Sequence, residues 1–443
     1  MVLDHRYRTI LGVAFPLMIS GFIQTFVFVT DASFLSRYSI VAYDASGNAG
    51  LLYLTFFLAL MGMGDGIQIL MARRVGENRL GELGRIFGTG TLTLLGIAGM
   101  VFSVLYFVVP DLLPTYSNNM EIAEAQIDFL SVRSYALFFA AISLGVQAFF
   151  YAIGKTWVIL ICAGLTAVSN VLLDYLLIFG FGEVQAMGVK GAALASCLAD
   201  MIGMIFLLSM AAFSKTGKKY ALFANFSWSV QSLKEFLKVG APLFFQGFTA
   251  LATWTVFFTW IEQMGTHELT VSQNIRAVYF LAFIPIGGFA GTTKTYISQY
   301  IGAGRADEIP LLKRRLTWLT VGCLAVFFHG AILYPEELIR WVNPNEAYMK
   351  DSANILRYVA GSIFLYAFVS VRMHMINGSG NTNITFLIEL CCVSAYLLGA
   401  YLLIKVAKQE IYWVWSVEYI YFGVMGILAL IYLKFFNWKK RKI

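Results

Sequence analysis

The sequence predicts an all-α membrane protein with twelve transmembrane helices, arranged as two pseudo-symmetric six-helix lobes. Three observations predict this fold class. The chain is 59% hydrophobic and only 13% charged, whereas about one quarter of the residues in soluble domains are charged. Long apolar stretches recur along the whole sequence. The second half of the sequence also repeats the first half at a constant offset of 226 residues.

The apolar stretches are the expected helices, in chain order. Each is long enough to cross a hydrocarbon core about 30 Å thick, which takes roughly 20 residues of α-helix. The connections between them are short, so we expect no separate soluble domain. The twelve stretches lie at residues 9–35, 48–72, 85–110, 122–153, 156–179, 188–213, 235–262, 272–299, 312–334, 351–377, 382–406 and 411–435.

Lys and Arg residues are unevenly distributed between the two sides of these expected helices. Most of the 32 lie at the termini and in the even-numbered loops, and this bias predicts that both termini are cytoplasmic. The formal charge of +7 therefore reflects membrane topology and not nucleic-acid binding. We expect a multi-pass protein of the cytoplasmic (inner) membrane, in contact with lipid and monomeric.

The repeat predicts how the lobes are organised. Pro16 aligns with Pro242, and the offset holds without a gap as far as Tyr175, which aligns with Tyr401. Because each half has six helices, both halves enter the membrane from the same side, as in transporters whose substrate path lies between parallel repeats. We expect an N-terminal lobe, a cytoplasmic linker and a C-terminal lobe at residues 1–215, 216–233 and 234–443.

Three residues of the first lobe, two acids and an amide, have neither an acid nor an amide at the aligned positions of the second lobe. At the 226-residue offset, Asp31 aligns with Phe257, Asn170 with Tyr396 and Asp174 with Ala400. Counted at 1.5 Å per residue, both aspartates lie roughly 27 to 31 Å along their helices, at similar depth. Two neighbouring carboxylates in a low-dielectric interior repel each other strongly. Such a pair can hold a proton or a cation and release it when the geometry changes.

Several segments resemble the multidrug and toxic compound extrusion (MATE) family. The resemblance covers nearly the whole chain, including the twelve-helix count and the two-lobe repeat. The segments are Pro16 with the following Thr-Asp31-x-x-Phe-Leu (helix 1 of the family), Ser-Asn170-Val-Leu-Leu-Asp174-Tyr-Leu-Leu-Ile-Phe and Gly188-Val-Lys-Gly-Ala-Ala-Leu-Ala-Ser196 (helices 5 and 6), and Ile301-Gly-Ala-Gly-Arg305 (the loop after helix 8).

The resemblance implies the MATE fold and an antiporter that exports small organic compounds, often cationic or amphipathic, in exchange for H⁺ or Na⁺. It implies no cofactor besides that coupling ion. It assigns cation or proton coupling to Asp31, Asn170, Asp174 and Ser196, and Ser196 stands where a threonine is common in the family. The first three would also be the ligands of a Na⁺ ion. Gln24 resembles a glutamine that lines the substrate cavity of some members.

One departure from the family pattern suggests a branch. NorM-like and eukaryotic members carry a glutamate about eight residues after the helix-7 proline, where this chain has Ala250. The nearest polar residues, Gln246 and Glu262, are not in register. The pattern therefore resembles the DinF-like branch of the MOP flippase superfamily, whose coupling site lies in the first lobe alone.

Other charged residues also fall within the expected helices. Arg133 and Asp200 both lie near mid-membrane in the first lobe, and Arg372 and Glu389 lie toward the inner ends of two helices of the second, with His374 close by. A buried charge costs several kcal/mol unless it is paired. We therefore expect an Arg133–Asp200 ion pair and an Arg372–Glu389 ion pair.

Three more charged residues suggest functional contacts. Asp65 and Lys294 lie toward the inner ends of helices from different lobes. We interpret them as a candidate inner gate that forms when the cytoplasmic side closes. Glu418, in the last helix, is expected to face the substrate cavity and attract cationic substrate.

The sequence leaves alternatives to an antiporter. A flippase for lipid-linked saccharides, from the same superfamily, would need a cationic cavity, and the basic residues within the helices are Arg133, Arg276, Lys294, Arg357 and Arg372. A channel would conduct ions without exchange. An intramembrane enzyme would need a polar catalytic set, and neither a His-Glu-x-x-His motif nor a phosphate-binding loop occurs. We expect no enzyme.

Overall fold

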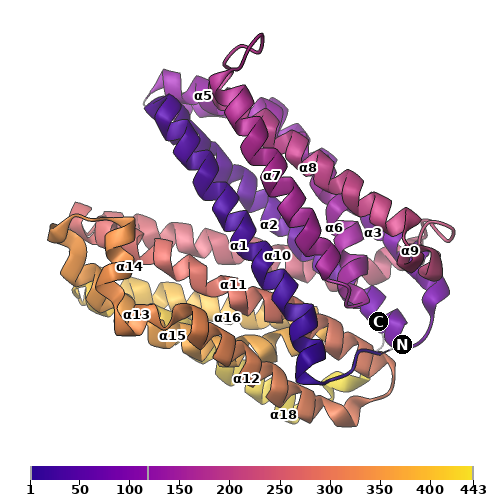
Figure 1. Ribbon diagram of the computed structural model, residues 1–443. Coiled ribbons are helices and arrows are strands. Elements are labelled where there is room, and N and C mark those ends of the chain that lie inside the picture. The colour runs from indigo at the N-terminus through magenta and orange to yellow at the C-terminus, as the bar shows by residue number, and fades with distance from the viewer. Residues whose placement is uncertain (1, 117–118, 442–443) are drawn as a thin grey trace. The chain divides into compact units, whose positions relative to one another are not determined.

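The structure, a computed structural model, describes residues 2–116 and 119–441, and helices account for almost all of them (Figure 1). The chain forms two compact units. The first unit is Phe15–Phe244, and the second unit combines Val2–Ala14 with Phe245–Ile443. The predicted all-α class is confirmed for the described residues, in which the pairing of Phe181 with Val184 is an isolated bridge and no strand forms.

The helices of the first unit follow the expected stretches closely. A π-helical turn at Val104–Val108 joins α3 to α4, and the short α9 lies in the expected linker. The helices are α1 (Tyr7–Tyr38), α2 (Ile40–Gly76), α3 (Leu83–Ser103), α4 (Val109–Tyr116), α5 (Met120–Arg133), α6 (Ala136–Ala152), α7 (Trp157–Phe179), α8 (Gly188–Phe213) and α9 (Lys215–Tyr220).

The second unit repeats this pattern with interruptions near some helix ends. The expected stretch 312–334 is divided at His329 into α12 and α13, and π-helical residues Leu402–Val406 extend α16. The helices are α10 (Val230–Glu262), α11 (Thr266–Gly302), α12 (Ile309–Phe328), α13 (Gly330–Leu333), α14 (Pro335–Val342), α15 (Glu346–Gly378), α16 (Thr382–Tyr401), α17 (Ile411–Val414) and α18 (Val417–Phe435).

Ten helices in the described part of the chain are long and apolar enough to cross a membrane. α5 and α6 meet at a bend of 44° and together make an eleventh span, the fourth of the expected order. α12 would be the twelfth. It has 20 residues, and Lys313, Arg314 and Arg315 near its start make it less apolar than the others.

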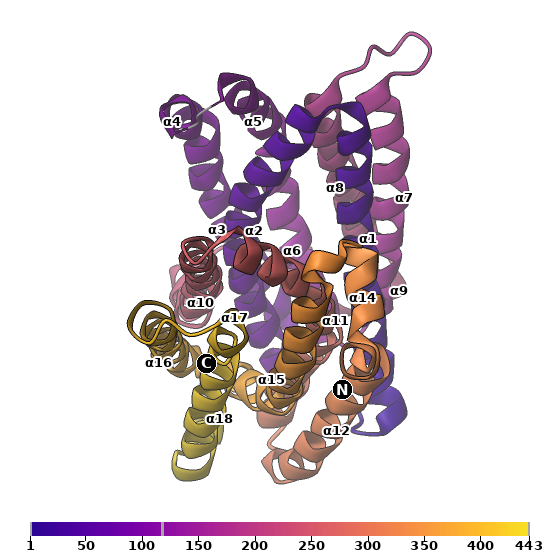
Figure 2. The same cartoon turned by 90° about the vertical axis from the view of Figure 1, so that its left-hand side faces the viewer.

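α7 and α8 are packed along their length, side by side in both views (Figure 1, Figure 2). α7 ends at Gly180, whose φ of 80° lies in the left-handed region that favours glycine, and the chain then turns back into α8. Gly191 of α8 faces the backbone of α7, where a Cβ atom would lie 2.6 Å from the carbonyl carbon of Leu177. The missing side chain therefore allows the close approach that brings polar groups of the two helices together.

The first helix of each lobe crosses the division between the units close to a proline. α1 enters the first unit at Phe15, next to Pro16, and α10 enters the second unit at Phe245, three residues after Pro242. Because proline removes one backbone hydrogen bond, each of these helices has a point at which bending is favoured.

The two units divide between Ala14 and Phe15 and between Phe244 and Phe245, whereas the expected boundaries are at residues 215 and 234. The linker belongs to the first unit because its backbone is tied to α3: Thr89 Oγ1 donates to the Ser227 carbonyl at 3.4 Å and accepts from Ser229 N at 3.3 Å. The N-terminal residues belong to the second unit because α11 and α12 hold their backbone. Tyr296 Oη donates to the Asp4 carbonyl at 2.9 Å, and Arg315 donates to the His5 carbonyl at 2.8 Å.

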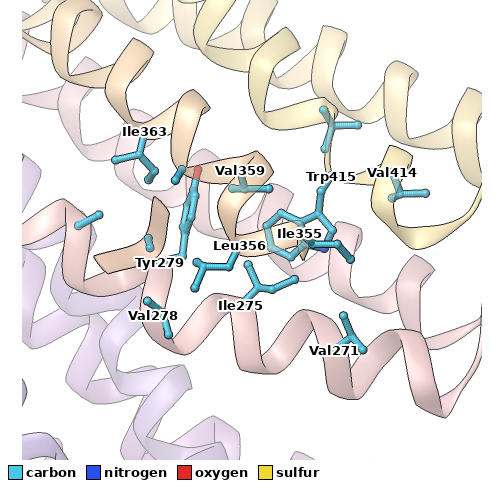
Figure 3. Close-up of a cluster of buried hydrophobic side chains, with 14 of the residues drawn as sticks. Val271, Ile275, Val278, Tyr279, Ile355, Leu356, Val359, Ile363, Val414 and Trp415 are labelled. Atoms are coloured by element: carbon cyan, nitrogen blue, oxygen red, sulfur yellow. The ribbon is translucent and has the colours of Figure 1, made fainter. Parts of the chain in front are cut away.

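α11, α15 and the segment before α18 contribute the part of the second unit's core that Figure 3 shows, and α10, α12 and α16 add further buried residues. Apolar residues recur three or four positions apart on α11 and α15 and so face each other. Trp415 is fully buried among them, and its indole Nε1 donates to Ser272 Oγ at 3.2 Å. The labelled residues are Val271, Ile275, Val278, Tyr279, Ile355, Leu356, Val359, Ile363, Val414 and Trp415.

Candidate functional site

Polar residues of α1, α7 and α8 meet inside the first unit. Asn170 and Asp174 lie one turn apart on α7 and are 1% and 0% exposed. Asp31 of α1 and Ser196 of α8 are partly buried beside them. The structure therefore brings together the four residues to which the sequence analysis assigned ion coupling.

The Asn170 amide is the centre of this cluster. With its nitrogen facing the carboxyl groups, it donates to Asp31 Oδ1 at 2.8 Å and to Asp174 Oδ2 at 3.3 Å, while its oxygen accepts from Ser196 Oγ at 3.2 Å. The orientation of an amide is assigned from its hydrogen-bond partners, and this orientation satisfies both ends. One neutral side chain thus connects two acids and a hydroxyl from three helices.

The two carboxyl groups also lie within hydrogen-bonding distance of each other. Asp174 Oδ1 is buried and has no donor among the described residues. A carboxylate only accepts hydrogen bonds, whereas a protonated carboxyl group donates one. A proton shared by Asp31 and Asp174 would therefore both supply a missing donor and remove the repulsion between two negative charges.

An apolar cluster closes one end of the site. Leu35 and Ile178 each lie one turn beyond an aspartate, on α1 and α7, and are 2% and 0% exposed. Val189 and Ala192 of α8 complete the cluster together with Ala42 of α2. Water is thereby kept from this end of the acids, so an ionised pair would be poorly solvated there.

A partly buried ion pair lies next to the acids. Arg133, the last residue of α5, contacts Asp200 of α8 with an N–O distance of 2.8 Å, which confirms the predicted pair. Its guanidinium also lies 4.6 Å from the ring centroid of Tyr53. Arg133 is close enough to interact electrostatically with both Asp31 and Asp174. The acids therefore have a positive charge nearby, although that charge is already paired.

The oxygen atoms of this cluster could hold a proton or a hard cation. The described residues contain no group of three or more His, Cys, Asp or Glu side chains that could hold a metal. Carboxylate, amide and hydroxyl oxygens are ligands that hard cations accept. In the opposite amide orientation the Asn170 oxygen faces the acids and its nitrogen donates to Ser196 Oγ at 3.2 Å, which is the arrangement that a Na⁺ ion among Asp31, Asn170 and Asp174 would use.

Two other predicted site residues lie apart from this cluster. Gln24 is exposed on α1, seven residues before Asp31. Glu418 is 2% exposed within the second unit, where Tyr279 Oη donates to it at 2.6 Å and Tyr396 Oη at 3.0 Å. This placement differs from the expectation that Glu418 faces an open cavity, because tyrosines and the apolar core enclose its carboxyl group.

The predicted pair of Arg372 and Glu389 is wrong. Glu389 instead accepts from Tyr421 Oη and, at 3.4 Å, from Gln246 Nε2. Arg372 donates to the carbonyl of Phe368 on its own helix. The two side chains therefore bind different partners and do not pair. The tyrosines that bind Glu389 and Glu418 were not predicted from the sequence, although the alignment of Tyr396 with Asn170 was a signal for one of them.

Asp65 and Lys294, the candidate inner gate, lie in different units, on α2 and α11. Lys294 is 6% exposed and Asp65 is partly buried. Their contact stays a prediction.

Four of the basic residues considered for a flippase have partners within their own units. Arg133 pairs with Asp200, as described above. In the second unit, Arg276 packs 4.7 Å from the ring centroid of Phe258, Arg357 Nε donates to the Ile332 carbonyl at 3.0 Å, and Arg372 donates to the Phe368 carbonyl.

Comparison with known proteins places these features in a family. The MatE family model matches residues 16–176 and 242–402, and the second match begins 226 residues after the first, as the internal repeat does. A probable multidrug resistance protein NorM of Thermotoga maritima is 24% identical over 98% of this chain and 94% of its own length.

Solved structures show the same fold. A MATE protein in the straight conformation superposes with a TM-score of 0.86 at 17% identity, covering 96% of this chain and 94% of that one. A MOP superfamily transporter from Pyrococcus furiosus superposes with a TM-score of 0.84 at 17% identity and the same coverage. The family match covers well over half of the residues and both halves of the repeat. The chain therefore belongs to the MatE family of membrane transporters, and it is not an enzyme.

Proposed function

We propose that this protein is a proton-coupled antiporter that exports small organic compounds. Its coupling site is Asp31, Asn170, Asp174 and Ser196. The observation that carries the proposal is the pair of neighbouring carboxyl groups bridged by one buried amide. The names of its relatives as multidrug resistance proteins support an organic substrate.

Protonation changes the balance of forces between α1 and α7. With one proton, Asp31 and Asp174 attract each other through a hydrogen bond, and the Asn170 amide donates to both. Without it, two unit charges about 4 Å apart repel by about 4 kcal/mol at an effective dielectric constant of 20. That energy is large enough to change which packing of α1 is favoured, because a few kcal/mol separate the conformations of a two-state protein.

α1 is suited to transmit this change because it belongs to both units. Its first residues are held in the second unit, and the part that carries Asp31 packs in the first unit beyond Pro16. A shift of the helix at Asp31 therefore acts on the segment that joins the units. Proton release would favour one orientation of the transporter and proton binding the other, which is the requirement for exchange.

The proposed location is the cytoplasmic membrane, with transport directed outward. The Lys and Arg distribution supports a cytoplasmic membrane protein with both termini inside. We expect a monomer surrounded by lipid that moves organic compounds toward the outside.

The test is efflux of a fluorescent organic cation from proteoliposomes under an imposed pH gradient or an imposed Na⁺ gradient. We expect the pH gradient to drive efflux, and Asp31→Asn and Asp174→Asn each to abolish it. Asp44→Asn is the matched control, because Asp44 is an exposed acid on α2 of the same unit. Unchanged pH-driven efflux in both site variants would refute the coupling site. Efflux driven by the Na⁺ gradient alone would show that Na⁺, and not H⁺, is the coupling ion.

A further inference from the structure

The second unit contains a buried acid that the proposed mechanism does not use. Glu418 lies in the first turn of α18 and is 2% exposed. Its Oε2 accepts from Tyr279 Oη at 2.6 Å, and its Oε1 accepts from Tyr396 Oη at 3.0 Å. Both tyrosines are buried, and Tyr279 of α11 extends into the core between α11 and α15 (Figure 3). Each carboxyl oxygen thus has one hydroxyl partner.

The internal repeat relates this place to the coupling site of the first unit. At the 226-residue offset, Tyr396 aligns with Asn170 and Tyr279 aligns with Tyr53. Asn170 binds the acids of the first unit, and Tyr53 lies against the arginine beside them. Glu418 therefore occupies the equivalent surroundings in the second unit, although it comes from the sixth helix of its lobe and not from the first or fifth.

The carboxyl group of Glu418 has no cationic partner among the residues that the structure describes. The arginines on α11 and α15 are engaged elsewhere: Arg276 packs over Phe258, and Arg357 and Arg372 bind backbone carbonyls. The titratable groups that face it or its two partners are all phenols. They are Tyr279 on α11, Tyr366 on α15, Tyr396 on α16 and Tyr421 on α18. The next acid, Glu389, is itself bound by Tyr421 and Gln246.

These surroundings suit a group that exchanges a proton. An isolated carboxylate in an apolar interior costs several kcal/mol, so its neutral form is favoured unless a cation is nearby. A tyrosine hydroxyl group can either donate or accept a hydrogen bond. A protonated Glu418 can therefore donate to one tyrosine and accept from the other, whereas the ionised form accepts from both. In both states each carboxyl oxygen therefore keeps a hydroxyl partner.

A metal ion would not find enough ligands here. Glu418 supplies the single acid, and no group of three or more His, Cys, Asp or Glu side chains occurs in the described part of the chain. Both carboxyl oxygens are already occupied by hydroxyl donors at hydrogen-bonding distance. The proton is the ligand that the contacts accommodate without rearrangement.

We propose that Glu418, held between Tyr279 and Tyr396, is a second proton-binding site, located in the second unit. It goes beyond the coupling site proposed above and does not depend on it. A transporter with both sites would hold one exchangeable proton in each lobe.

Infrared spectroscopy of the purified full-length chain in lipid bilayers tests this inference. At neutral pH, exposed carboxyl groups are ionised, and the carbonyl stretching band of protonated carboxyl groups reports buried acids. We expect Glu418→Gln to remove one such band. We expect Tyr396→Phe, which keeps the ring but removes one hydroxyl group, to shift that band to higher frequency because the carboxyl group loses a hydrogen bond.

Two controls separate this result from other effects. Glu410→Gln changes an exposed glutamate just before α17 and should leave the bands unchanged. In the Asp31→Asn/Asp174→Asn double variant the Glu418 band should persist, so the two proposals can fail independently. A neutral-pH spectrum that is the same in the parent and in Glu418→Gln would overturn the inference. If that variant does not fold, an unshifted band in folded Tyr396→Phe would overturn it equally.

Discussion

Replacing Asn170 with leucine tests the role of the amide bridge. The change keeps the size of the side chain but removes its hydrogen bonds to Asp31, Asp174 and Ser196. The amide donates to both acids and thereby favours their charged forms. The better bond, at 2.8 Å to Asp31 Oδ1, contributes about 1.5–3 kcal/mol, as expected for a bond to a charged group.

That free energy predicts the size of the effect. The same bond to a neutral carboxyl group contributes about 0.5–1.5 kcal/mol, and one pH unit corresponds to about 1.4 kcal/mol, so losing the bond should raise the pH of half-maximal proton-driven efflux by about one unit. The assay is efflux from proteoliposomes across a series of pH values at constant gradient. Asn48→Leu makes the same chemical change at an exposed position of α2 and should leave the profile in place. A profile that does not move, in a variant that still folds, would refute the reasoning.

Three further predictions concern stability. Gly191→Ala places a methyl group against the α7 backbone and should cost about 1–3 kcal/mol and slow efflux, whereas Gly164→Ala, which faces open space, should be neutral or slightly stabilising in thermal unfolding. Arg74→Met removes the buried partner of three partly exposed glutamates and should lower the free energy of unfolding by about 1–3 kcal/mol, measured by denaturant titration in detergent. Hydrogen bonds from Arg305 lower the pKa of Glu308. The stability that this contact contributes is therefore fully present above the unfolded carboxyl pKa of about 4.5, and it is lost as the pH falls through the lower pKa of the folded state. Hydrogen exchange of the loop after α11 should therefore accelerate in acid, and Arg305→Ala should weaken this pH dependence, leaving the smaller contribution of His5.

Helix number and site depth could be predicted from the sequence because both follow from the length of apolar stretches. The rise of 1.5 Å per residue places Asp31 and Asp174 at similar depth once their helices are identified. The repeat then identifies them as exceptions within a duplicated bundle. The structure confirms that these two acids and Asn170 meet.

The direction in which a side chain points could not be predicted in the same way. Glu389 and Arg372 were expected at matching depths but bind different partners, and Glu418 is buried within its own unit. A residue's angle about the helix axis depends on how whole helices pack, which depth does not determine. The 44° bend between α5 and α6 was also missed, because neither proline nor glycine lies in the break at Ser134.

The most direct test of the coupling account measures whether protonation moves α1 within the first unit. Spin labels at Phe28 of α1 and Leu172 of α7 lie on exposed positions, 69% and 60% accessible. We predict that the distance between them in lipid changes between acidic and alkaline pH in the parent chain and stays constant in the Asp31→Asn/Asp174→Asn double variant. An identical pH response in both proteins would contradict the claim that these two acids couple protons to the position of α1.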